Sequence, residues 1–224
     1  KPDDFKRVLY NGLRTVYLLS LITSVMMMIL SDDIMRALFK WGSSGTEYDV
    51  FYGGLCLLAY SATLVFSSTI AMMTRAFYSV HDSKTPLFGG IFGIVILYIL
   101  NAGFNRFTNI GIAGTALAYS ISAFFNMMIY LLAFRRKTGI DVITDNFGYI
   151  VKAVLAAIPA GLITFGLKLL VRPDINSKLS QILALCVPAA GGMGLFWFIL
   201  LKMKTPEVTY INNLVLSRLK LVKK

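Results

Sequence analysis

The sequence has few charged residues, a single histidine and two cysteines. Only 15% of its 224 residues are charged, against roughly 25% in soluble domains, whereas 57% are hydrophobic. With one histidine, His81, and no GxSxG, HExxH or phosphate-binding glycine loop, the chain lacks the side-chain groupings of the common hydrolases, metalloproteases and nucleotide-binding enzymes. We therefore expect a protein that is not an enzyme and holds no organic cofactor or metal.

The two cysteines do not form a metal or redox motif. Cys56 and Cys186 stand far apart within apolar stretches, without a CxxC pair or a neighbouring histidine. This placement is typical of packing residues.

What the sequence does have is six apolar stretches that fill most of its length. About 20 residues of α-helix cross a hydrocarbon core of about 30 Å, and the stretches run too far without alternation for barrel strands. The sequence therefore predicts an all-α integral membrane protein with a six-transmembrane-helix bundle in residues 1–204. The predicted spans are 7–30, 49–78, 86–104, 110–134, 147–171 and 179–203.

The distribution of lysine and arginine predicts the orientation. Six crossings put both termini on one side, and 16 of the 22 basic residues fall on that side, against six on the other. By the positive-inside rule, both termini are expected in the cytoplasm. The net charge of +11 thus has a membrane explanation, and we do not expect nucleic acid as a partner.

Two further segments have amphipathic character. Residues 31–42 mix charged and apolar side chains and predict a short helix in the outer interface, with Trp41 as its anchor. Residues 205–224 predict a basic amphipathic helix on the cytoplasmic surface, in contact with anionic membrane lipids. Because the chain opens with Lys1-Pro2 and no Met, we expect it to be part of a longer protein.

Polar and helix-breaking residues inside the spans leave two interpretations open. The second span has hydroxyl groups at Ser61, Thr63, Ser67, Ser68, Thr69 and Thr74. These hydroxyls either bond to carbonyls of their own helix or form the polar wall of a cavity. Pro159 and Pro188 each remove a backbone hydrogen bond within the last two spans, and we expect them to open those helices near mid-membrane.

Three segments together resemble a known family. They are Asn11-Gly12-Leu13-Arg14 in the first span, the run from Arg75 to Pro86, and the run from Gly111 to Ser120 before Arg135-Arg136-Lys137. In this order they resemble the MurJ (MviN) family of lipid II flippases in the multidrug/oligosaccharidyl-lipid/polysaccharide exporter superfamily, and the similarity covers the whole chain. The resemblance implies a bacterial plasma membrane protein of fourteen helices in two lobes. This chain matches the last six helices, so the N-lobe and the first two helices of the C-lobe are missing.

The resemblance also implies the activity. Members of the family move lipid II, an undecaprenyl-pyrophosphate-linked precursor of peptidoglycan, from the cytoplasmic to the outer leaflet by alternating access. The family's cavity arginines lie mainly in the N-lobe, which would be the partner of this chain, and its last two helices line an apolar groove for the lipid tail. The groove candidates here are Pro159, Phe165, Leu169, Leu183, Pro188, Phe196 and Phe198. Alternatives are export of another lipid-linked saccharide or a drug, and a membrane scaffold that transports nothing.

Two sets of residues are candidates for the mechanism. The turn after the second span contains the gate or hinge candidates Arg75, Tyr78, Asp82, Lys84 and Pro86. Arg75 could bond the last carbonyls of its helix, and Asp82 could pair with a lysine or cap the next helix.

A sodium site described in some family members would fall on Asn101, Asn105, Thr115 and Tyr119. Asn105 replaces the family carboxylate and one contributing helix is absent. Cation binding should therefore be weakened, because hard cations favour anionic oxygen ligands. Sodium and the membrane potential both remain open as energy sources.

Overall fold

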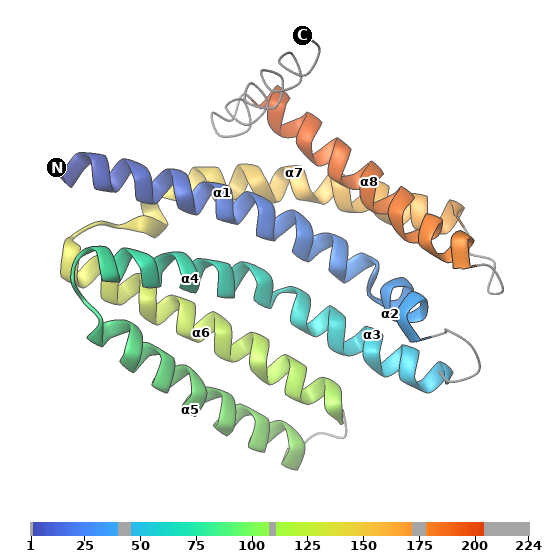
Figure 1. The fold of residues 1–224 in the computed structure, drawn as a ribbon, viewed down its shortest axis with the longest axis horizontal. Coiled ribbons are helices and arrows are strands. Elements are labelled where there is room, and N and C mark those ends of the chain that lie inside the picture. The colour runs from blue at the N-terminus through green and yellow to red at the C-terminus, as the bar shows by residue number, and fades with distance from the viewer. Residues whose placement is uncertain (1, 40–45, 108–110, 172–177, 204–224) are drawn as a thin grey trace, which may run out of the picture.

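The computed structural model describes residues 2–39, 46–107, 111–171 and 178–203, and its regular structure there is helical (Figure 1). The helices are α1 (Pro2–Ile29), α2 (Ser31–Phe39), α3 (Glu47–Ser61), α4 (Thr63–Ser79), α5 (Lys84–Phe107), α6 (Ile112–Thr138), α7 (Val142–Leu170) and α8 (Lys178–Lys202). Six stretches, with α3 and α4 counted as one, are long and apolar enough to cross a membrane. The predicted six-helix membrane architecture is confirmed for the described residues.

Several helices extend beyond the predicted spans because capping groups set their ends. The Asp82 carboxylate accepts hydrogen bonds from the backbone N–H groups of Lys84 and Thr85, so α5 begins two residues before Pro86. α6 continues through its basic last turn to Thr138, and Gly139 ends it in the left-handed conformation (φ 72°). Asp141 caps α7 through the N–H of Thr144, which moves its start to Val142.

The second predicted span, 49–78, corresponds to one stretch long and apolar enough to cross a membrane, Glu47–Ser79, but this stretch consists of two helices and not one. The helix is interrupted at Ala62, between α3 and α4. Hydroxyl groups from two neighbouring helices bond to carbonyls at the interruption. Ser24 of α1 donates to the Ser61 carbonyl at 2.7 Å, and Ser120 of α6 donates to the Ala59 carbonyl at 2.5 Å. Backbone groups need such partners where water is absent.

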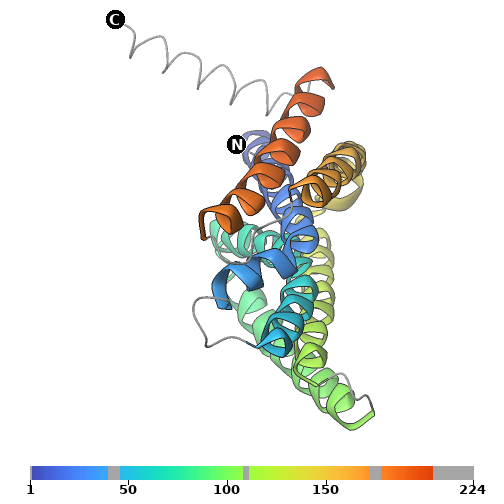
Figure 2. The ribbon, with the colours of Figure 1, turned by 90° about the vertical axis from the view of Figure 1, so that its right-hand side faces the viewer.

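α1 lies at the centre of the bundle and takes part in both of its apolar cores (Figure 1). One core joins α1 to α4 and α6 through buried residues such as Leu13, Phe77 and Phe134. The other joins α1 to α7 and α8 through Ile22, Ala160 and Phe196. Figure 2 shows α7 and α8 on one side of α1 and the α3 to α6 helices on the other.

α5 and α6 form a pair with hydrogen bonds spaced along its length. Tyr130 donates to the Pro86 carbonyl and Ser122 to the Gly93 carbonyl, each at 2.8 Å. Thr115 donates to the Asn101 side chain at 3.0 Å, near the other end. Polar bonds of this kind help to hold helices together in lipid, where hydrophobic exclusion does not.

α7 and α8 pack closely through small residues, and neither Pro159 nor Pro188 ends its helix. Gly192 lies directly against Thr164 and the Ala160 carbonyl, and Gly191 lies against Leu167. The close contacts thus use the two glycines that follow Pro188, whereas a side chain at Gly194 would meet no atom within 4 Å.

The short helix predicted in residues 31–42 corresponds to α2, which packs on α3 and α8. Its predicted anchor, Trp41, lies outside the described residues, as does the predicted amphipathic helix in residues 205–224.

Candidate functional site

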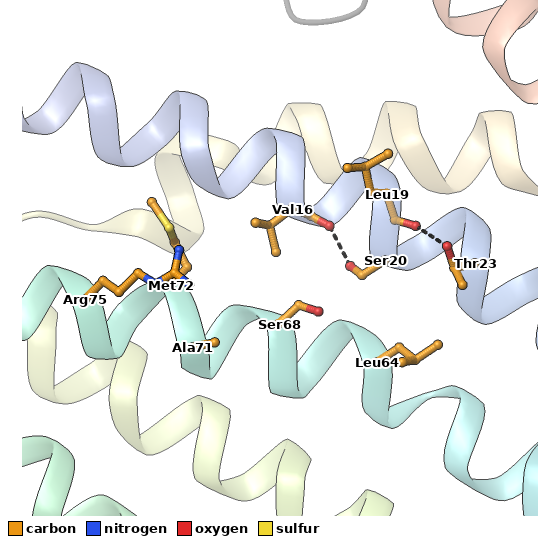
Figure 3. A pocket seen from close by; sticks show the side chains of 9 residues that line it. All are labelled: Val16, Leu19, Ser20, Thr23, Leu64, Ser68, Ala71, Met72 and Arg75. Atoms are coloured by element: carbon orange, nitrogen blue, oxygen red, sulfur yellow. Dashed lines mark hydrogen bonds between the residues drawn. The ribbon is translucent and has the colours of Figure 1, made fainter.

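A cleft of about 420 Å³, mostly apolar but with three hydroxyl groups and one arginine in its lining, lies between α1 and α4 (Figure 3). Its lining residues are Val16, Leu19, Ser20 and Thr23 of α1 and Leu64, Ser68, Ala71, Met72 and Arg75 of α4. Hydroxyl groups occupy the middle of the cleft, and Arg75 is its only charged lining residue. The cleft can therefore receive a polar or anionic group in an otherwise apolar membrane segment.

Some hydroxyl groups of the second span bond to carbonyls of their own helix, and others line a cavity, so both interpretations of these residues hold in part. Thr69 and Thr74 donate to carbonyls of their own helix, as do Ser20 and Thr23 across the cleft on α1. Ser68 instead lines the cleft. Ser67 lines a second pocket of about 320 Å³ between α4, α5 and α6.

Arg75 does not bond the last carbonyls of α4 as expected. Within the described part of the chain, it makes no hydrogen bond or ion pair. Figure 3 shows its side chain beside Met72 at one end of the cleft. A guanidinium in this place can bind an anionic group from a ligand or from another part of the protein.

An apolar groove of about 390 Å³ lies on the opposite face of α1, against α7. Leu21, Val25 and Ile29 of α1 line it, together with Val154, Ala157, Ile158, Gly161, Leu162 and Phe165 of α7. At 100° per residue, these α1 positions point about half a turn away from those that line the cleft. A single helix thus separates a cleft that contains hydroxyl groups and Arg75 from a groove that is wholly apolar.

The seven groove candidates do not all share one surface. Only Phe165 lines the groove between α1 and α7. Leu169, Leu183 and Phe198 are exposed on the outside of α7 and α8, whereas Pro188 is buried. Phe196 is 1% exposed and belongs to the core of α1, α7 and α8, so it offers no surface to a ligand in this arrangement.

Asp82 joins three helices at one end of the bundle. One carboxylate oxygen caps α5, and the other pairs with Lys137 in the last turn of α6 at 2.5 Å. The hydrogen bond from Lys137 and those from Thr85 hold the pKa of the Asp82 carboxyl well below its usual range. Asp82 therefore does both things that the sequence left open, pairing with a lysine and capping the next helix.

The other gate candidates have separate surroundings. The Pro86 carbonyl accepts the Tyr130 hydrogen bond, while the side chains of Tyr78 and Lys84 are exposed. The five candidates are therefore grouped around one turn, but no direct contact joins Arg75 to Asp82 in the described structure.

Three of the four sodium-site positions lie together between α5 and α6. The Asn101 side-chain oxygen accepts hydrogen bonds from Asn105 at 3.3 Å and from Thr115 at 3.0 Å. Tyr119 instead packs edge-on against Tyr60. The cluster holds no carboxylate, and the described residues contain no group of three His, Cys, Asp or Glu suited to a metal.

The polar contacts that α7 makes with α1 and α2 were not expected from the sequence. At one end, Arg14 donates to the buried Asn146 at 2.9 Å, and Asp145 accepts from Tyr10 and pairs with Lys6. At the other end, Lys168 pairs with Asp33 and donates to the Ile29 carbonyl, both at 2.9 Å. A possible signal was the spacing of Lys6, Tyr10 and Arg14, which places them on one helix face.

Comparisons with known proteins agree with this arrangement. The family model described as lipid II flippase MurJ matches residues 1–202. A probable lipid II flippase MurJ of Vibrio cholerae is 35% identical over 127 residues, which cover 57% of this chain and 24% of that protein. One of Buchnera aphidicola is 25% identical over 162 residues, which cover 72% and 31%.

A solved structure gives the same fold. It is a lipid II flippase MurJ in an inward closed conformation, with a TM-score of 0.66 and 21% identity over 90% of this chain and 41% of that one. The chain spans about a quarter to a third of the length of the curated relatives it matches. Because the family model covers all but the last 22 residues, the chain belongs to the lipid II flippase MurJ family.

Proposed function

We propose that this chain is the C-terminal part of a flippase that moves lipid II from the cytoplasmic to the outer leaflet by alternating access, for cell-wall synthesis. The observation that carries the proposal, beside the family, is the pair of surfaces on α1. One face lines a cleft with hydroxyl groups and Arg75, and the other lines a wholly apolar groove. A lipid with a charged saccharide headgroup needs both kinds of surface on its path.

The headgroup clamp belongs to the part of the protein that this chain lacks. A pyrophosphate carries several negative charges, and the cleft supplies one cation, Arg75. Most other basic residues lie at helix ends or in turns. Arg14, which lies further inside α1, donates to Asn146, and Lys168 in the last turn of α7 pairs with Asp33. The N-lobe is thus the partner that supplies the remaining cations, and this chain supplies one wall of the path.

The undecaprenyl tail follows the apolar side of the bundle. Phe165 lines the groove between α1 and α7, and Leu169, Leu183 and Phe198 are exposed on α7 and α8. Moving an isoprenoid chain from lipid to such an apolar surface releases little free energy, because both surroundings are apolar. The surface therefore guides the tail without binding it tightly.

The turn that contains Asp82 is the gate or hinge, and it lies on the cytoplasmic side with both termini. The gate candidates Arg75, Tyr78, Lys84 and Pro86 surround this turn. In the full-length protein, Arg75→Ala and Asp82→Ala should each lower the rate of lipid II transport, even at temperatures well below the melting temperature of the variant. If transport in membrane vesicles stays unchanged while the melting temperature falls, the gate assignment is wrong.

The cluster of Asn101, Asn105 and Thr115 does not make transport depend on sodium. Its oxygens are neutral, and the Asn101 oxygen already accepts hydrogen bonds from the Asn105 amide nitrogen and the Thr115 hydroxyl, so a hard cation gains little from the cluster. Replacing sodium by potassium at a constant membrane potential should leave transport unchanged, which would favour the potential as the energy source.

Native mass spectrometry tests the function directly. Lipid II and an undecaprenyl-linked saccharide unrelated to peptidoglycan are offered to the full-length protein and to this 224-residue chain. Selective binding of lipid II by the full-length protein alone is the expected result. Preference for the other saccharide would indicate an exporter of a different lipid-linked unit.

A further inference from the structure

Met72 fills a notch in α1 that exists because residue 12 is glycine. Gly12 lies opposite Met72, and a Cβ atom at this position would overlap the Met72 methyl group and lie 3.5 Å from its sulfur. Both residues are partly exposed, so the notch is not sealed on all sides. Figure 3 shows the Met72 side chain rising from α4 toward α1, next to Arg75.

We propose that Met72 is a movable plug of the cleft between α1 and α4. With its thioether in the Gly12 notch, the Arg75 end of the cleft is open. When the side chain turns out of the notch, the thioether lies across the cleft between Val16 and Arg75 and closes that end. This inference rests on the proposed function only in assigning the cleft to the transport path.

The chemistry of methionine suits this role. Its side chain is unbranched with three rotatable bonds, so it can change rotamer without moving its helix. The atom that meets Gly12 is the far end of the side chain, whereas the helix backbones are held by the core of Leu13, Met73 and Phe77. The space available to the displaced side chain is the cleft itself, which Met72 already lines beside the small Ala71.

A single methyl group added at the notch, in Gly12→Ala, provides a way to close the cleft. Gly12→Ala should evict the Met72 methyl from the notch and narrow the cleft. Adding Met72→Ala to Gly12→Ala should reopen the cleft, because the alanine side chain reaches neither the Gly12 notch nor across the cleft. Gly166→Ala is the matched control, since a Cβ there would meet no atom within 4 Å.

The test uses the full-length protein in lipid nanodiscs, with Cys56 and Cys186 replaced by serine and a Ser68→Cys reporter inside the cleft. The modification rate of the reporter by a small charged thiosulfonate measures access to the cleft. Lipid II transport by the same glycine and methionine variants in vesicles measures gating. We expect Gly12→Ala to slow both several-fold, the Gly12→Ala/Met72→Ala double variant to recover both, and Gly166→Ala to change neither.

The proposal has two parts, the closing of the cleft by Met72 and the effect of that closing on transport, and each has results that would overturn it. An unchanged modification rate in Gly12→Ala overturns the plug. A double variant that stays slow shows that the helices moved and not Met72, which also overturns it. Slower modification with normal transport overturns the gating role. If the unsubstituted protein moves no lipid II, the proposed function fails, and the modification rates still decide whether Met72 closes the cleft.

Discussion

Asp82 and Lys137 are 55 residues apart in the chain and form an ion pair that joins the α4–α5 turn to the last turn of α6. The same carboxylate caps α5 through two backbone N–H groups. One side chain therefore fixes the relative positions of three helix ends, and a change in its charge affects all of them.

The Asp82 contribution to stability should be constant near neutral pH and be lost only in acid. The pKa of its carboxyl is lowered in the folded protein by Lys137 and Thr85, so its stabilisation is complete above the unfolded pKa of about 3.9 and falls as pH drops through the folded value. The difference in melting temperature between the unsubstituted protein and Asp82→Asn should stay the same from pH 8 to about 5 and shrink below about 4. A difference that already shrinks between pH 7 and 6 would contradict this.

Removing the Lys168 ammonium should destabilise the contact of α7 with the end of α1 and the start of α2. Lys168→Met removes the ion partner of the Asp33 carboxylate and the donor to the Ile29 carbonyl, which we expect to cost about 1–3 kcal/mol. Lys202→Met is the control, because Lys202 makes no hydrogen bond with the described residues, and it should have little effect. Chemical denaturation in detergent measures both. Equal effects of the two variants would mean that the Lys168 contacts contribute nothing.

The interruption at Ala62 should depend on Ser120. This serine donates to the Ala59 carbonyl and shares a hydrogen bond with Thr63 at 2.6 Å, so Ser120→Ala breaks contacts between helices. We expect a loss of about 0.6–1.7 kcal/mol, which runs from the average to the maximum measured for such bonds in a membrane protein. Thr15→Val should cost less, because the Thr15 hydroxyl bonds only to the Asn11 carbonyl of its own helix. Hydrogen exchange at residues 59–66 should rise in Ser120→Ala alone.

The close packing of α7 and α8 should fail when Gly192 gains a side chain. A Cβ there would overlap the Thr164 hydroxyl and approach the Ala160 carbonyl to 3.1 Å, and a backbone group cannot move aside easily. We expect Gly192→Ala to lower stability by about 1–3 kcal/mol. Gly194→Ala, two residues away and open on its outer side, should be neutral or slightly stabilising. Thermal melting compares the stability of the two variants. Similar melting temperatures would contradict the need for glycine at position 192 in the contact between α7 and α8.

The sequence was sufficient for the six-helix architecture because the length and apolar character of a span are properties of consecutive residues. It was not sufficient for the interruption at Ala62, because the groups that stabilise it, Ser24 and Ser120, come from other helices. Ala62 itself has no helix-breaking character, so no local pattern marks the position.

The candidate site was predictable in its residue types and less so in its geometry. The run from Arg75 to Pro86 correctly marked the turn at which Asp82 pairs and caps. The apolar stretches could not show which side of each helix faces its neighbour. For this reason Phe196 was assigned to the groove although it is buried, and Leu21 and Val25 on α1 were overlooked.

The hydrogen bonds between α5 and α6 bear on the order in which the protein is made. All three lie within one helical hairpin, and the most distant pair, Pro86 and Tyr130, is 44 residues apart. None of them needs a residue of α7 or α8. During synthesis, this hairpin can satisfy its own polar groups as soon as both of its helices have entered the bilayer, while the last two helices are still on the ribosome.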